Sequence, residues 1–124
     1  MKAKVLVVGL GMLAAVAHAA PVTLQQGGSL EQQLRLIMEH EGCTLDWRLT
    51  VDAPAQEAAQ TYSSWTGAAY GTAKQISQVT AADKKIADLA APVMCDDGKT
   101  LVMTTFRDSV RLVGIPGGSC HPLK

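Results

Sequence analysis

The chain has 124 residues with 11 basic and 11 acidic side chains, so its formal net charge at pH 7 is zero. This balance argues against nucleic acid and anionic membrane surfaces as partners, because both favour basic proteins. The length allows one domain with a single modest hydrophobic core.

The first twenty residues have the pattern of a cleavable secretory signal. Two lysines at the start of the chain precede an apolar run that covers residues 5–17, and residues 17–19 have the small-x-small pattern found before a cleavage site. We expect the cut after Ala19 or Ala20. An uncleaved anchor is the alternative, but the apolar run is short for crossing a bilayer.

Residues 21–124 are therefore expected to form the mature protein, a single domain with a loose C-terminal tail. Without Lys2 and Lys4, the basic side chains number 9 against 11 acidic ones, so this part is slightly acidic. It contains no second apolar run of spanning length, and we expect no transmembrane anchor after cleavage. The domain should work outside the cytoplasm.

All three cysteines lie in the mature part, where an oxidising compartment permits disulfides. We expect Cys95 to pair with Cys120, because this bond would tie the glycine-rich tail to a strand. Cys43 would then be left over as a small buried apolar residue.

A strand and a helix open the mature chain. Residues 22–26 alternate like a short strand, and two glycines break it. Ser29 and Gln32 form a capping-box pattern that predicts a helix from this point, and Gly42 suits the left-handed residue that closes one. One helical face carries the apolar residues Leu30, Leu34, Ile37 and Met38.

The next segment alternates as a half-buried strand. Four apolar residues, Leu45, Trp47, Leu49 and Val51, point one way, and polar residues point the other. Strand, helix and strand in this order predict a helix packed across a small sheet. The expected core consists of Leu30, Leu34, Ile37, Leu45, Trp47 and Leu49.

Three of the five aromatic residues, Tyr62, Trp65 and Tyr70, fall within nine positions among serines and glycines. One interpretation is a loop that folds its rings over the edge of the sheet. The other is a partner-binding patch, because Tyr and Trp are frequent anchors of protein interfaces.

The second half predicts another strand and helix, followed by a hairpin. Residues 74–79 read as a strand with Ile76 buried, and residues 80–83 as the start of a helix that carries Ile86 and Leu89 and ends before Pro92.

Residues 93–95 and 100–106 then form a hairpin, because the Asp-Gly pair at its centre favours a tight turn. Residues 110–113 are expected to be one more strand or an extended tail.

Side chains that carry chemistry are present, but none is arranged as a catalytic, cofactor or metal site. His40 ends a polar helix face and His121 lies in the tail, so neither is placed beside a nucleophile or shows ligand spacing with the cysteines. Asp96 and Asp97 are better explained by the hairpin turn that follows them. We therefore expect a protein without enzyme activity, cofactor or metal.

Residues 28–47 resemble the C-terminal domain of the toxin-coregulated pilus biosynthesis protein Q family, which is found in type IV pilus systems. The positions that match the family's pattern are Ser29, Leu30, Leu34, Gly42, Leu45 and Trp47, while Cys43 replaces an aromatic residue. The resemblance implies an α+β fold, a small mixed sheet with two helices packed on it, built from strand-helix-strand units like those of secretin N-terminal domains.

The resemblance also implies a function. It is that of a non-enzymatic periplasmic accessory protein in pilus biogenesis or a secretion system, binding an outer-membrane secretin or a neighbouring assembly subunit. Edge-strand addition is the expected route of contact, with Tyr62, Trp65 and Tyr70 as candidate anchors. The alternative is a freestanding periplasmic inhibitor or immunity-type protein, and an enzyme ranks third.

Overall fold

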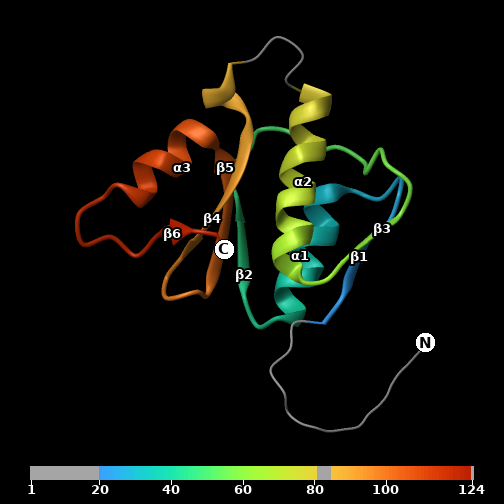
Figure 1. The fold of residues 1–124 in the computed structure, drawn as a ribbon, viewed down its shortest axis with the longest axis horizontal. Coiled ribbons are helices and arrows are strands. Elements are labelled where there is room, and N and C mark those ends of the chain that lie inside the picture. The colour runs from blue at the N-terminus through green and yellow to red at the C-terminus, as the bar shows by residue number, and fades with distance from the viewer. Residues whose placement is uncertain (1–19, 81–84, 124) are drawn as a thin grey trace, which may run out of the picture.

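A computed structural model describes residues 20–80 and 85–123, which form an α+β fold with three α-helices and two sheets (Figure 1). The predicted signal peptide lies almost entirely outside the described residues. The larger sheet has the strand order β2-β5-β4-β6, and β2 runs parallel to β5 while the other neighbours are antiparallel. Its strands are β2 (Thr44–Trp47), β4 (Ala90–Cys95), β5 (Thr100–Thr105) and β6 (His121–Pro122).

Helices cover both faces of this sheet (Figure 1). The two helices α1 (Leu30–His40) and α2 (Trp65–Thr80) lie on one face, and α3 (Phe106–Val113) lies on the other. A two-stranded ribbon of β1 (Val22–Leu24) and β3 (Gln60–Tyr62) flanks α1 and α2. The third helix makes the fold three-layered, whereas the sequence predicted two helices.

The helix of the predicted first unit and the strand that follows it are confirmed, but β1 pairs with β3 in the small ribbon and does not join β2 in the larger sheet. Ser29 Oγ accepts a hydrogen bond from the Gln32 amide at 3.1 Å, as a capping box requires. Asp52 is the other acceptor at the start of α1. Its carboxylate accepts from the Ser29 hydroxyl and, at 3.0 Å, from the Glu31 amide. At the other end Gly42 has φ +79°, and the Cys43 amide donates to the Met38 carbonyl, which closes α1 as a Schellman motif.

The main core lies between α1, α2 and the sheet. The structure buries Leu30, Leu34 and Leu45 as expected, while Ile37, Trp47 and Leu49 are half-buried and pack against the core. Residues that alternate along β4 and β5 divide between the two faces. Met94, Leu101 and Met103 face α1 and α2, and Val93, Cys95 and Val102 face α3.

The predicted strand after residue 44 is shorter than expected. Strand β2 ends at Trp47, and Val51, predicted to point inward, is 37% exposed. The chain turns away from the sheet here, and the turn brings Asp52 to the start of α1. Next to it, the Leu30 amide donates to the Ala53 carbonyl at 2.9 Å. The Trp47 indole N–H donates to the Val51 carbonyl and covers the turn.

The prediction for residues 62–79 was wrong. Neither an aromatic loop nor a strand at residues 74–79 is present, because Tyr62 ends β3 and α2 covers Trp65, Tyr70 and the predicted strand. Its buried residues recur at helical spacing and are mostly small: Ala68, Ala69, Thr72, Ala73, Gln75 and Ile76. Small residues give a weak hydrophobic signal, which is why the helical period escaped notice.

The predicted helix near residue 86 is reduced to a 3₁₀ turn, Ile86–Asp88, in which Ile86 is 71% exposed. Of its predicted start at residues 80–83, Thr80 is the last residue of α2, and residues 81–83 lie outside the described residues. Pro92 does not follow a helix but lies inside β4. The hairpin of β4 and β5 is confirmed, and Asp96 and Asp97 both take positive φ in its turn.

Residues 110–113 belong to α3, not to a strand or an extended tail. Thr105 begins the helix by accepting from the Asp108 amide at 3.2 Å, and Thr104 donates to the Asp108 carboxylate at 2.9 Å. Hydrogen bonds from Arg111 are the main cause that lowers the pKa of the Asp108 carboxyl below its usual value. These contacts join the polar side of α3 to the end of β5.

Tyr62 lies so close to α2 that glycine is required beneath its ring. A Cβ atom at Gly71 would lie 2.2 Å from Tyr62 Oη and 2.6 Å from Cζ. Alanine in a helix gains about 1 kcal/mol over glycine, but overpacking costs about 1–3 kcal/mol. We expect Gly71→Ala to lower the free energy of unfolding by about 1 kcal/mol, measured by urea denaturation.

The control is the same substitution in a Tyr62→Ala background. Without the ring, Gly71→Ala should stabilise the protein by about 1 kcal/mol through helix propensity alone. Stabilisation of the otherwise unchanged protein would contradict the close contact.

Candidate functional site

The three aromatic residues singled out in the sequence lie in different surroundings. Tyr62 is half-buried against α2, and this burial, together with Glu57, raises the pKa of its phenol. Trp65 is half-buried against the main core. Tyr70 is 47% exposed, so of the three it presents the most open surface to solvent. The structure therefore does not bring them together as one patch.

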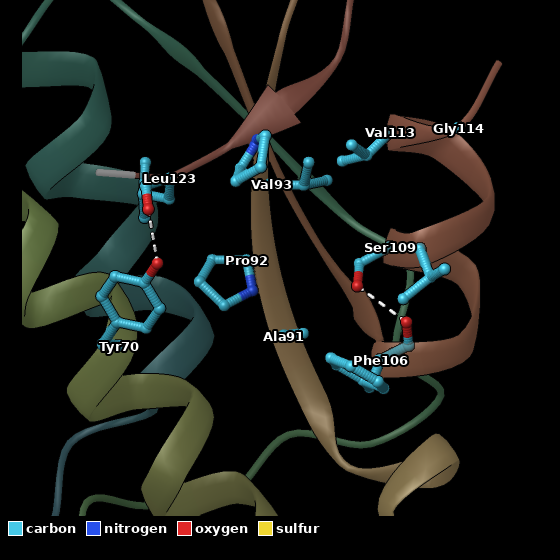
Figure 2. Close-up of a pocket in the computed structure, with 11 residues that line it drawn as sticks. Tyr70, Ala91, Pro92, Val93, Phe106, Ser109, Val113, Gly114 and Leu123 are labelled. Carbon is cyan, nitrogen blue, oxygen red and sulfur yellow. Dashed lines mark hydrogen bonds between the residues drawn. The ribbon is translucent and has the colours of Figure 1, made fainter.

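Tyr70 instead lies on the wall of an apolar groove at the edge of the large sheet (Figure 2). The groove has a volume of about 540 Å³ and runs between α2 and α3 along the outer edge of β4. Most of the side chains that line it are apolar, and none is charged. They are Tyr70, Ala91, Pro92, Val93, Phe106, Ser109, Val110, Val113, Pro122 and Leu123, with Gly114 at one end.

One wall of the groove is a helix face that is only partly covered by the described part of the chain. Phe106, Val110 and Val113 recur at positions i, i+4 and i+7 of α3, and they are 45%, 56% and 37% exposed. The opposite side of the helix packs Leu112 against the sheet. Helix α3 thus has two apolar sides, and only one of them contributes to the core.

The floor of the groove is the open edge of β4. Strand β6 pairs only with Val93 and Met94, so the edge beyond it is not covered by a strand. The Ala90 amide donates to Ser77 Oγ of α2 at 2.9 Å, and Pro92 has no amide proton. Ala90 and Pro92 therefore offer no free amide N–H at this edge of β4.

The polar groups within the groove are already engaged (Figure 2). The Tyr70 hydroxyl donates to the Leu123 carbonyl at 2.6 Å, and the Ser109 hydroxyl donates to the Phe106 carbonyl at 2.7 Å. A polar ligand needs converging donors and acceptors for its orientation. Because these hydroxyls are used internally, the groove suits an apolar surface better than a polar metabolite.

The C-terminal arm, residues 120–123, closes one end of the groove. Pro122 and Leu123 line it, and Leu123 also fills the main core. The arm is fastened by the disulfide expected from the sequence, between Cys95 of β4 and Cys120.

Cys43 is a free thiol, half-buried rather than fully buried, and lies 3.5 Å from the Gly98 carbonyl.

A second hollow continues the groove past Tyr70 toward the other end of β4. It shares Tyr70, Ala91 and Pro92 with the first and adds α2 residues that include Lys74. Lys74 is exposed and has no ion-pair partner among the described residues. Of the residues that the structure describes, it is the one Lys, Arg, Asp or Glu side chain that lines either hollow.

Neither a metal cluster nor a membrane span is found in the described part of the chain. Within residues 20–80 and 85–123, no three His, Cys, Asp or Glu side chains gather where they could hold a metal ion. None of the described helices combines the length and hydrophobicity needed to cross a membrane.

Comparison with known proteins finds no matching family model, no matching curated protein and no matching solved structure. The pilus-family resemblance therefore depends on residues 28–47 alone.

Of the partner-binding residues predicted from the sequence, Tyr70 lines the groove, while the wall formed by α3 was not predicted. A signal for that wall was available, since Phe106, Val110 and Val113 have helical spacing. Thr105 and Asp108 at cap spacing also marked the start of the helix. The sequence did not predict the floor of the groove, because Pro92 was interpreted as the residue that ends a helix and not as part of a strand.

Proposed function

We propose that this protein is an exported, non-enzymatic binding domain that holds an apolar surface of a partner in the groove between α2 and α3. The observation that carries the proposal is the exposed α3 face of Phe106, Val110 and Val113 beside Tyr70. An apolar groove of this kind is typical of a protein interaction site, and aromatic side chains are frequent anchors.

We further propose that the partner is an envelope assembly protein in the periplasm, either a secretin or a neighbouring subunit of a type IV pilus or secretion apparatus. The resemblance over residues 28–47 supports this partner class. The α+β fold and the helix packed on β2 agree with it, and the disulfide is compatible with a compartment outside the cytoplasm.

Site-specific photo-cross-linking in the native host tests this proposal. The photoreactive amino acid p-benzoylphenylalanine replaces Val110 in the groove, and Leu36, which is 65% exposed on α1, serves as the control position. We expect a cross-linked product at Val110 that mass spectrometry identifies as a secretin or assembly subunit, and no such product at Leu36.

Two outcomes would contradict the proposed function. A secreted hydrolase or toxin at Val110 would favour an inhibitor or immunity-type protein instead. Equal cross-linking at both positions, or no product at Val110, would remove the groove as the binding site.

A further inference from the structure

The geometry of the groove also limits which shape of partner can enter it. This inference deepens the proposed function because it concerns the same groove. The groove and the second hollow together follow the edge of β4, and each has one helix face about two turns long: α3 from Phe106 to Val113 lines the groove, and α2 from Tyr70 to Ser77 lines the second hollow. Each face is therefore about 10 Å long.

An extended peptide would find few hydrogen bonds at the open edge of β4. In a strand, successive residues direct their backbone groups alternately to the two sides. The Phe106 amide donates to the Leu89 carbonyl on the β5 side, and the Ala90 amide donates to Ser77 on the other side. Ala90, Pro92 and Met94 are thus the residues that face outward.

None of these outward positions is left with an amide for a new strand. Ser77 takes the Ala90 amide, Pro92 has no proton to donate, and β6 covers the Met94 position. Strand addition depends on a ladder with donors as well as acceptors. The route of contact expected from the sequence is therefore disfavoured at this edge.

We infer that the groove receives an amphipathic helix of the partner, with its apolar face against α3 and Tyr70 and an acidic residue beside Lys74. Helices pack by placing the ridge of one into the groove between others, which suits the helix faces that line the groove and the second hollow. The apolar anchors of such a helix recur at i, i+3 or i+4, and i+7, which matches the spacing of Phe106, Val110 and Val113.

Charge selects this occupant over a second copy of the same chain. Among residues 20–80 and 85–123, no acidic side chain lines the groove or the second hollow, and Lys74 is the one basic side chain that does. The nearby cations of α3 are already paired, Arg107 with Asp88 at 3.4 Å and Arg111 with Asp108 at 2.6 Å. Two copies packed groove to groove would leave both Lys74 ammonium groups without an acidic partner, whereas an acidic helix supplies one.

Selection of peptides from a random 12-residue phage library tests the shape and charge of the occupant. The target is the full protein exported to the periplasm of an expression host, so that the disulfide can form. We expect the selected peptides to repeat apolar residues at helical spacing, to carry an acidic residue, and to gain helical circular dichroism on binding.

Three variants locate the binding site. Val110→Lys introduces a charge into the apolar contact and should weaken binding at least about tenfold, equal to about 1.4 kcal/mol. Leu36→Lys adds the same charge to an exposed apolar site on α1 and should change affinity less than about twofold. Lys74→Glu should shift the selection from acidic to basic peptides, and circular dichroism of each variant checks its fold.

Several results would overturn the inference. Selected peptides that alternate with a period of two would indicate strand addition, and the absence of any binder sensitive to Val110→Lys would exclude the groove. A dimer in sedimentation analysis that Val110→Lys dissociates would assign the groove to self-association. The inference rests on the proposed function, but the two failures are distinguishable: a specific cross-link at Val110 together with selected peptides of period two would keep the groove as the binding site and exclude the helical occupant alone.

Discussion

Replacing Leu34 by alanine is expected to lower the free energy of unfolding by about 3 kcal/mol. Leu34 is completely buried at the centre of the main core, where α1 and α2 meet the sheet. The substitution removes apolar contact and leaves a cavity that the surrounding helices can fill only in part. Urea denaturation followed by the fluorescence of Trp47 and Trp65, both packed against this core, measures the loss.

The matched control lies two residues away on the same helix. Leu36 is 65% exposed, so Leu36→Ala should change the free energy of unfolding by less than about 0.5 kcal/mol. A loss below about 1 kcal/mol for Leu34→Ala would mean that α1 does not pack on the sheet as the structure has it. The helix-on-sheet architecture would then be wrong, and the pilus analogy would lose its structural support.

The first unit of the fold was predictable because its signals are local and strong. Large aliphatic residues mark the buried face of α1, while Ser29 and Gly42 mark its ends. In α2 the buried residues are mostly alanine and threonine, so composition alone did not separate a helix from a loop. The structure forms a helix there because small residues allow α2 to pack closely against α1 and under Tyr62.

The groove was harder to predict because its parts are distant in the chain. Its walls come from α2 and α3, its floor from β4, and its closed end from the C-terminal arm. A single sequence reveals the apolar side of α3 but not that the side remains uncovered. Only the short pairing of β6 with β4 leaves this edge open, and such pairing depends on tertiary structure.

Removal of the disulfide, by Cys95→Ala with Cys120→Ala, is expected to lower the free energy of unfolding by about 3 kcal/mol. The bond closes a loop between residues 25 positions apart, and the chain-entropy model assigns this stabilisation to a loop of that length. The C-terminal arm should also detach locally, because β6 has only two residues. Urea denaturation measures the global loss, and hydrogen exchange at His121 and Leu123 measures the local one.

Cys43→Ala is the control, because this thiol is free and should cost less than about 1 kcal/mol when removed. Peptide mapping without reductant should find Cys95 joined to Cys120, and a linkage to Cys43 would contradict the assignment.

The local detachment of the arm also links the disulfide to binding in the groove. Leu123 accepts from Tyr70 and forms the closed end of the groove, so a detached arm would remove an apolar wall and free the Tyr70 hydroxyl. Peptides that bind the groove should therefore bind the double variant more weakly even where it remains folded.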